Sequence, residues 1–234
     1  MKKTVKTIFG IGYFSPFELA LWCVSVALVI ISSLVFRGGA VRQIAAAVGI
    51  TSIILNAKGN PVGQGLMIIF SLLYGIISFS LAYYGEMITY LGMTMPMSVA
   101  ALVSWIRNPY KGRKSEVRVG SVGAKEGVFM SVLTALVTGV FYFILKALGT
   151  ANLFPSTVSV ATSFAAVYLT ARRSPLFSLA YAANDAVLMI LWGMAGAEDA
   201  GYIPVFVCFA AFFACDAYGF VSWRKMKKRQ ETEA

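Results

Sequence analysis

Long apolar stretches separated by short polar turns follow one another along the chain. A helix needs roughly 20 apolar residues to cross the hydrocarbon core of a bilayer, so each stretch predicts a membrane-spanning helix. The second stretch is shorter than the others, and only the connection 107–126 is long, basic and glycine-containing. The predicted spans are 17–36, 44–57, 62–84, 87–106, 127–148, 153–171, 174–196 and 202–223.

The composition indicates an integral membrane protein. Of the 234 residues, 59% are hydrophobic and 13% are charged, and the mean hydropathy is +0.76. Soluble domains are about half apolar and about a quarter charged. The net charge of +10 does not indicate nucleic acid as a partner, because the Lys and Arg residues lie between the apolar stretches. Cys23, Cys208 and Cys215 lie inside these stretches and His is absent, so no disulfide, metal site or cofactor is expected.

The distribution of positive charge predicts the orientation in the membrane. With the N-terminus in the cytoplasm, 17 of the 20 Lys and Arg residues fall on the inner side, and only Arg37, Arg42 and Lys146 fall outside. Positive residues concentrate on the cytoplasmic side of membrane proteins. We therefore expect a multi-pass protein of the cell (plasma) membrane with both termini in the cytoplasm. The start MKKTVK is signal-like in charge but no convincing cleavage site follows, so the first span is expected to be retained.

The stretch 174–195 carries two polar residues, Asn184 and Asp185, near its middle. A carboxylate in the hydrocarbon layer costs about 2.5–3.5 kcal/mol on insertion scales unless it faces a partner or a water-filled cavity. Two interpretations stay open: the polar pair holds two helices together, or it lines a substrate site at the midplane. On a helix, the aromatic residues on the same or the neighbouring stripe are Phe177, Tyr181 and Trp192.

An internal repeat relates two parts of the chain. Three matches follow one another along the chain. Thr51-Ser52 matches Thr162-Ser163, which lies 111 residues further on, and Pro61 matches Pro175, which lies 114 residues further on. Val103-Ser104-Trp105 matches Val221-Ser222-Trp223, which lies 118 residues further on. Spans two to four would then repeat as spans six to eight, with span five between them, so that both units run in the same direction. Parallel repeats place a substrate site at their interface near the midplane. Chance similarity between apolar helices is the alternative.

The repeat divides the chain into five expected parts of an all-α membrane protein. They are an N-terminal stretch with an extra helix (1–43), a first three-helix repeat (44–107), a basic cytoplasmic linker with a linker helix (108–150), a second three-helix repeat (151–225) and a charged cytoplasmic tail (226–234).

The repeat also singles out a second acid. Asp216 corresponds to Ser98, and Asn184 corresponds to Phe70, so only the second unit carries these polar groups. A carboxylate among aromatic rings suits a flat polar or cationic ring, which stacks on the faces and forms hydrogen bonds at its edge. The aromatic residues on the stripe of Asp216 include Phe209, Phe212, Phe213, Phe220 and Trp223.

Several short motifs resemble the Pnu-type vitamin transporters. They are LYGIISF at 73–79, YGEM at 84–87, Pro96-Met97 ahead of Trp105, and, in the second half, Asn184 and Tyr218-Gly219 ahead of Trp223. The resemblance covers roughly 44–225. It implies a SWEET-like 3+1+3 arrangement of spans in parallel repeats, with an extra N-terminal helix here, and often a homotrimer. It also implies that a nucleoside-like vitamin moves down its gradient and is then trapped by a cytoplasmic kinase.

The resemblance places Asn184 at a family position that faces the substrate. Four other family positions differ here: two Trp are replaced by Phe177 and Ala180, an Asn four residues before Tyr74 by Phe70, and a Gln or Asn by Ser98. These departures leave nicotinamide riboside, a deoxynucleoside, thiamine and riboflavin open as substrates. The predicted site comprises Asn184, Asp216, Tyr181, Asp185, Trp192, Phe177, Phe212 (or Phe213), Tyr74 and Ser98.

The function expected from this resemblance is uptake of nicotinamide riboside by facilitated diffusion. Common enzyme signatures such as G-x-S-x-G and the P-loop do not occur in the sequence. An intramembrane aspartyl enzyme that uses Asp185 and Asp216, or a scaffold subunit of a larger transporter, are the alternatives from other classes. Two acids within the membrane permit proton coupling but do not require it.

Overall fold

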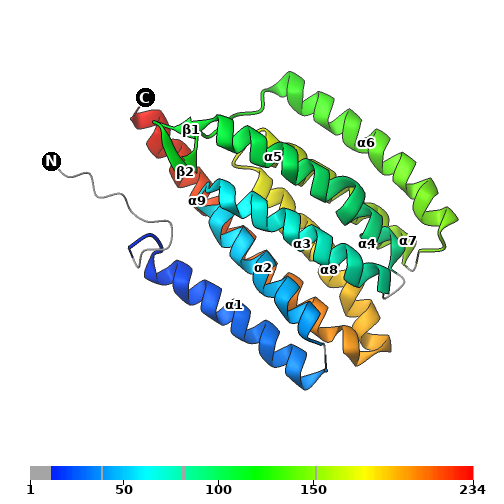
Figure 1. Ribbon diagram of the computed structural model, residues 1–234. Helices are drawn as coiled ribbons and strands as arrows, with labels where there is room; N and C mark the ends of the chain where they lie inside the picture. Colours follow the sequence, from blue (N-terminus) through cyan, green and yellow to red (C-terminus); the bar gives the residue numbers. More distant parts are fainter. Residues whose placement is uncertain (1–11, 38, 81–82, 151, 234) are drawn as a thin grey trace.

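The computed structural model describes residues 12–37, 39–80, 83–150 and 152–233, and long helices lie side by side in it as one bundle (Figure 1). Within the described residues, eight helical segments are long and apolar enough to cross a membrane. The elements are α1 (Pro16–Val35), α2 (Ala40–Ala57), α3 (Pro61–Ser80), α4 (Tyr84–Ile88), the π-helical segment η1 (Thr89–Thr94), α5 (Met95–Arg107), β1 (Pro109–Tyr110), β2 (Arg113–Val117), α6 (Ala124–Ala147), α7 (Leu153–Ala171), α8 (Phe177–Glu198), the 3₁₀ turn η2 (Ala200–Tyr202) and α9 (Ile203–Thr232).

Most predicted spans agree with these helices to within a few residues. α2 is longer than predicted, because it begins at Ala40 and reaches 18 residues. α9 runs for 30 residues to Thr232, so the segment 226–234, predicted as a tail, continues the last span as helix for most of its length. An ion pair one turn apart, Lys227 Nζ to Glu231 Oε1 at 3.7 Å, supports this continuation.

The fourth span is a composite of α4, η1 and α5. Pro96 has no N–H group and cannot continue a regular helical ladder. The N–H of the preceding Met95 donates to Tyr90 O, five residues back, which widens the helix locally. Such π-bulges are frequent at functional sites. Here η1 holds Tyr90 against Tyr74 of α3, with ring centroids 4.4 Å apart.

The turns after α2 and α7 are built in the same way. Each turn contains one residue with positive φ, Gly59 at +67° and Arg173 at +60°. The closing bonds are Asn60 N–H to Leu55 O and Ser174 N–H to Leu169 O, both 3.0 Å. These bonds satisfy carbonyl groups that a helix leaves without partners at its C-terminus. Equivalent residues of the two turns are 114 positions apart, as Pro61 and Pro175 are.

Each of these helix ends is anchored by a helix from the other half of the chain. We call α2 to α5 the first half and α7 to α9 the second half. The anchoring bonds are Trp105 Nε1–H to Thr170 O (2.9 Å), Ser104 Oγ–H to Ala171 O (2.8 Å), Trp223 Nε1–H to Asn56 O (2.7 Å) and Ser222 Oγ–H to Ala57 O (2.7 Å). The last helix of each half therefore holds the first helix of the other half.

α1 and α6 lie at opposite edges of the bundle (Figure 1). Only 6% of the most apolar window of α6 is buried, and large apolar side chains such as Phe143 are exposed along it. Such a surface suits a helix that faces lipid. α1 packs on α2 and α9, and its Glu18 carboxylate accepts hydrogen bonds from Lys58 Nζ (3.0 Å) and from Tyr218 Oη (2.8 Å).

The β1–β2 hairpin and the residues after it cross one end of the bundle, which we call the hairpin end. Val117 N–H donates to Gly59 O, and Gly120 N–H donates to Arg173 O, both at 2.9 Å. The connection between the two halves therefore runs along both of the turns described above.

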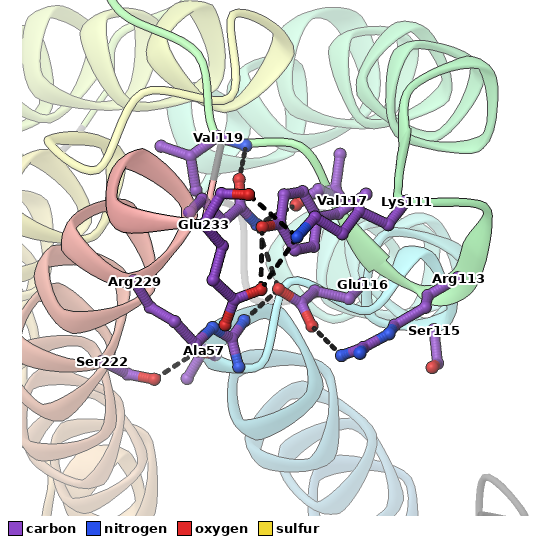
Figure 2. A network of polar contacts seen from close by, with 12 residues as sticks. Ala57, Lys111, Arg113, Ser115, Glu116, Val117, Val119, Ser222, Arg229 and Glu233 are labelled. Carbon is purple, nitrogen blue, oxygen red and sulfur yellow. Dashed lines mark hydrogen bonds and ion pairs between the residues drawn. The ribbon is translucent and has the colours of Figure 1, made fainter. Parts of the chain in front are cut away.

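The hairpin is also joined to the C-terminal part of α9 by a polar network, which we call the clasp (Figure 2). Its members on the hairpin side are acidic, basic and main-chain groups, and each has a partner on α9 or just beyond it. The contacts are Glu116 with Arg229, Lys111 Nζ with Glu233 Oε2 (3.2 Å), Gln230 Nε2–H with Val117 O (3.0 Å) and Val119 N–H with Gln230 Oε1 (2.9 Å). The clasp fixes the linker against the last helix.

Candidate substrate site

The predicted site residues lie at three heights along the bundle. Phe177 lies in an aromatic cluster near the hairpin end, together with Trp105 and Trp223. Asn184 and Asp185 lie about two helical turns further along α8, since a helix rises about 1.5 Å per residue. Trp192 lies about two turns beyond them, in a second aromatic cluster with Tyr74, Phe209 and Phe212. A polar middle layer is thus enclosed between two aromatic layers.

Asn184 is held by the hydroxyl groups of α7. Its Oδ1 accepts hydrogen bonds from Thr162 Oγ1 and Ser163 Oγ, both at 2.9 Å, and from Ser159 Oγ at 3.3 Å. The residue is 3% exposed. Within the described part of the chain, its amide nitrogen donates no hydrogen bond. The oxygen therefore braces α8 against α7, while the two N–H donors stay available to a ligand.

Asp185 and Asp216 face one another across the contact between α8 and α9. The two carboxyl groups are close enough to interact electrostatically, and the side chains are 3% and 4% exposed. Two buried carboxyl groups in such proximity repel each other when both are ionised. Among the described residues, Asp185 Oδ2 has no hydrogen-bond partner. The pair is therefore a desolvated acid site with one oxygen that is not used by the protein.

Tyr74 is at the centre of the second aromatic cluster. Its ring lies 5.6 Å from Phe70, 4.4 Å from Tyr90, 6.4 Å from Trp192 and 5.6 Å from Phe209 between centroids. The hydroxyl of Tyr74 and the indole nitrogen of Trp192 are buried without a hydrogen-bond partner in the described part of the chain. Buried polar atoms are normally paired, so these two could serve the polar edge of a ligand or bound water.

Four predicted residues need separate mention. Ser98 is 2% exposed and its hydroxyl also lacks a partner among the described residues. Of the two alternatives on α9, Phe212 is buried in the second aromatic cluster, whereas Phe213 is 42% exposed and lines a surface groove between α8 and α9. Tyr181 is packed against the cluster at the hairpin end, near Phe177, with ring centroids 6.2 Å apart.

A small cavity adjoins the second aromatic cluster. A cavity of about 20 Å³ lies between α1, α2, α3 and α9 and is lined by Phe70, Tyr74, Arg42 and Cys208, among others. A cavity of about 10–15 Å³ on this measure holds one water molecule, so this cavity has room for little more than one. A ligand the size of a nucleoside would therefore require these side chains to move apart.

Comparison with known proteins gives the family. The model of a family described as nicotinamide mononucleotide transporter matches residues 39–225, which is most of the chain. The chain belongs to the nicotinamide mononucleotide transporter family. The protein is thus a membrane transporter. The aspartyl-enzyme alternative required Asp185 and Asp216 to lie close together, and they do, but the family is one of transporters.

Two relatives of this transporter support the assignment. One is the nicotinamide riboside transporter PnuC of Neisseria mucosa, with 23% identity over 191 residues, covering 80% of this chain and 73% of the relative. The other is a crystal structure described as the vitamin B3 transporter PnuC, with a TM-score of 0.81 and 20% identity, covering 94% of this chain and 95% of that one. The second comparison shows that the fold is the same.

The family match leaves out α1 and the α9 side of the clasp in this transporter. It begins after α1 and ends at residue 225, ahead of the α9 residues that form the clasp. The middle layer, in contrast, lies entirely within the match. The candidate site therefore belongs to the part of the chain that the family shares.

Sequence reasoning missed the α7 hydroxyl groups that bind Asn184, and it missed Tyr90. A signal for the first was present: Ser156, Ser159 and Ser163 recur at helical spacing within an apolar stretch, which marks one polar face. No such signal existed for Tyr90, because its position depends on the π-helical segment. Within the described residues, no cluster of His, Cys, Asp or Glu could hold a metal ion.

Proposed function

We propose that this transporter carries nicotinamide riboside into the cell by facilitated diffusion and that a cytoplasmic kinase then traps it by phosphorylation. The observation that carries the proposal is the acid pair Asp185–Asp216 beside aromatic layers in the middle of the bundle. Nicotinamide riboside has a flat pyridinium ring with a fixed positive charge. Carboxylates attract such a ring, and aromatic faces stabilise a cation by contact with the ring quadrupole.

The charge of the middle layer favours a riboside over a mononucleotide. Among the described Lys and Arg residues, none contributes to the electrostatics of Asp185 or Asp216. A phosphate group would therefore enter a buried site without a basic partner and next to two acids. Burial of an unpaired anion is strongly unfavourable. The ribose hydroxyl groups could instead use the free donors and acceptors of Asn184, Tyr74 and Ser98.

The arrangement of the halves supports a SWEET-like 3+1+3 repeat, which we include in the proposal. The matched turns at Gly59 and Arg173 and the crossed bonds of Trp105 and Trp223 are the supporting contacts. α6 would be the linker helix and α1 the extra helix. In this arrangement the substrate passes between the two halves at the height of Asn184, Asp185 and Asp216.

The orientation is proposed from charge. Arg37, Arg42 and Lys146 lie at the end opposite the hairpin, and the other described Lys and Arg residues lie at the hairpin end or close to it. By the positive-inside rule the hairpin end faces the cytoplasm. We include in the proposal that the membrane is the plasma membrane and that both termini are cytoplasmic. The exposed apolar faces of α6 and α1 would meet lipid or neighbouring copies in a homotrimer.

A thermal-shift panel on the purified protein tests the substrate. A ligand that binds only the folded state raises the unfolding temperature in proportion to the logarithm of its concentration over Kd. Nicotinamide riboside should stabilise the protein more than thymidine, thiamine or riboflavin at equal concentration. Stabilisation by thymidine with none by nicotinamide riboside would replace the proposed substrate by a deoxynucleoside.

A further inference from the structure

We propose that Arg118 and Arg173 form a binding site for a phosphate group at the hairpin end, where the linker passes the turn between α7 and α8. The site is separate from the candidate substrate site and does not depend on which substrate is carried. The phosphate belongs to the headgroup of an anionic phospholipid or to a soluble phosphate, and both sources share the chemistry that the two arginines recognise.

The first support is the guanidinium group of Arg173. Its Nε and Nη1 atoms are buried, and neither has a hydrogen-bond partner among the described residues. A guanidinium group stays protonated in proteins and carries five N–H donors. Buried donors without partners are unfavourable, above all on a charged group. The group therefore has unused donors and an unbalanced charge, which an anion would satisfy together.

The second support is the distribution of acids around the turn. The neighbouring Arg172 is already neutralised, because its Nη2–H donates to Glu126 Oε2 at 3.0 Å. The same carboxylate accepts a hydrogen bond from Tyr168 Oη at 3.2 Å. In the part of the chain that the structure describes, none of the ion pairs includes Arg118 or Arg173. The protein itself thus leaves the positive charge of these two residues unbalanced.

The third support is the main chain, which holds the two arginines at the same place. Gly120 N–H donates to Arg173 O at 2.9 Å, and a Cβ atom on Gly120 would clash with Arg172 O. Arg118 lies two residues before this contact, and its own N–H donates to Asn108 O at 2.8 Å. In agreement with this geometry, burial and the positive charges of Arg172 and Arg118 lower the pKa of Arg173.

A phosphate group fits these surroundings. Guanidinium groups bind phosphate oxygens through charge-assisted hydrogen bonds, which are stronger than neutral ones. The site lies directly beyond Ala171, the last residue of a membrane-spanning helix, and therefore at the level of the lipid headgroups. Basic pockets between membrane helices bind anionic headgroups on the cytoplasmic side. A soluble phosphate also has access, because the side chain of Arg118 is exposed.

The experiment measures thermal unfolding of the full, delipidated chain in detergent and phosphate-free buffer. One arm adds phosphatidylglycerol, with phosphatidylcholine as the control, and the other adds inorganic phosphate, with chloride at equal ionic strength as the control. A ligand of the folded state raises the unfolding temperature. A rise with phosphatidylglycerol alone assigns the site to a lipid, and a rise with inorganic phosphate assigns it to a soluble phosphate. No rise in either arm would overturn the proposal and leave the proposed function intact.

The variant Arg173→Gln separates anion binding from a structural role. Without the anion it should unfold at the same temperature as the unchanged protein or a higher one, because an unpaired buried charge has been removed. With the anion it should unfold at a lower temperature than the unchanged protein. Lys228→Gln, an exposed residue of the same end, removes one positive charge and should keep the full rise. A full rise in Arg173→Gln, or an equal loss of stability with and without the anion, would overturn the proposal.

Arg118→Gln provides a second test that does not depend on the folding of Arg173→Gln. The side chain of Arg118 is exposed, and main-chain bonds fix its position, so the variant should fold. We expect the apparent affinity for the stabilising anion to fall about tenfold, which corresponds to about 1.4 kcal/mol. Arg118→Lys should recover only part of the loss, because lysine keeps the charge without the planar guanidinium group. Unchanged affinity in Arg118→Gln would overturn a site built from two arginines.

Discussion

The indole rings of Trp105 and Trp223 lie against each other, with centroids 5.3 Å apart and ring planes inclined by 49°. Both side chains are fully buried. They come from the last helix of the first half and the last helix of the second half, and each N–H group reaches a carbonyl at the end of the opposite half's first helix. This contact therefore joins the two halves, and it lies in the same buried cluster as the hairpin residue Val117.

Loss of either indole N–H group should destabilise the protein by a similar amount. Trp105→Phe leaves Thr170 O without its donor, and Trp223→Phe does the same to Asn56 O. A buried acceptor without a partner costs about 1–3 kcal/mol, to which the smaller ring adds. Thermal unfolding in detergent measures the effect. Trp22→Phe is the control, because its indole N–H donates to Thr51 Oγ1 (3.0 Å) at an exposed position, where water can replace the lost bond. A large loss for one of the two buried residues and none for the other would contradict equivalent roles.

Asn184→Ala should weaken substrate binding more than it weakens the helix contact. The change removes the acceptor of three hydroxyl groups and also two N–H donors. Thr162→Val is the matched control, because it removes one of the three bonds and leaves the donors of Asn184 in place. Each hydrogen bond contributes about 0.5–1.5 kcal/mol net. We expect affinity for nicotinamide riboside to fall about tenfold in Asn184→Ala and by less than threefold in Thr162→Val. Equal losses of affinity would mean that Asn184 acts only as a brace.

Nicotinamide mononucleotide should compete poorly with the riboside. Its phosphate carries close to two negative charges at neutral pH, and the residues around Asp185 supply no positive charge. Competition against labelled riboside in liposomes measures this difference. Inhibition by the mononucleotide at the same concentration as the unlabelled riboside would show that a phosphate has a partner that the middle layer does not provide.

The Lys111–Glu233 contact of the clasp should weaken in acid. Lys111 lowers the pKa of Glu233 by a hydrogen bond, and Glu233 raises the pKa of Lys111 in return. The contribution of Glu233 is present above the unfolded carboxyl pKa of about 4.3 and is lost as the pH falls through the lowered folded value. The contribution of Lys111 is present below its unfolded pKa and is lost only as the pH rises through the raised value.

The pH dependence of stability tests this statement. The difference in unfolding temperature between the unchanged protein and Lys111→Gln should be constant from pH 6 to pH 8 and become smaller as the pH is lowered below about 4, because the contact with the Glu233 carboxylate is then lost. Lys114→Gln, an exposed residue of the same hairpin, is the control and should show little difference at any pH. A difference that does not shrink in acid would mean that the carboxylate of Glu233 contributes nothing and that Lys111 acts through its bond to the main-chain Glu233 O (3.0 Å) or through packing.

The orientation can be tested with reporters. A reporter fused after Glu233 and one inserted near Arg113 should both report the cytoplasm, because both positions lie at the basic hairpin end. A reporter inserted between Glu198 and Asp199 should report the outside. An external signal from the hairpin would show that the proposed orientation is reversed.

The sequence by itself determined the number and approximate bounds of the spans, the positive residues at one end and the family. These features are local, since a run of apolar residues is long enough to cross a bilayer or it is not. The polar residues Asn184, Asp185 and Asp216 could also be found without a structure, because acids and amides are rare inside apolar stretches.

Only the tertiary structure decided how those residues meet. The sequence left open whether Asp185 faces a cavity or another helix, and the structure places it against Asp216 of α9. It directs the oxygen of Asn184 to α7 and separates Phe177 from Tyr74 by placing them in different aromatic layers. A helical periodicity identifies which residues share a stripe, but the neighbour that each stripe contacts depends on how distant helices pack. Here that packing is set by contacts such as the crossed bonds of Trp105 and Trp223, which join residues at least 65 positions apart in the chain.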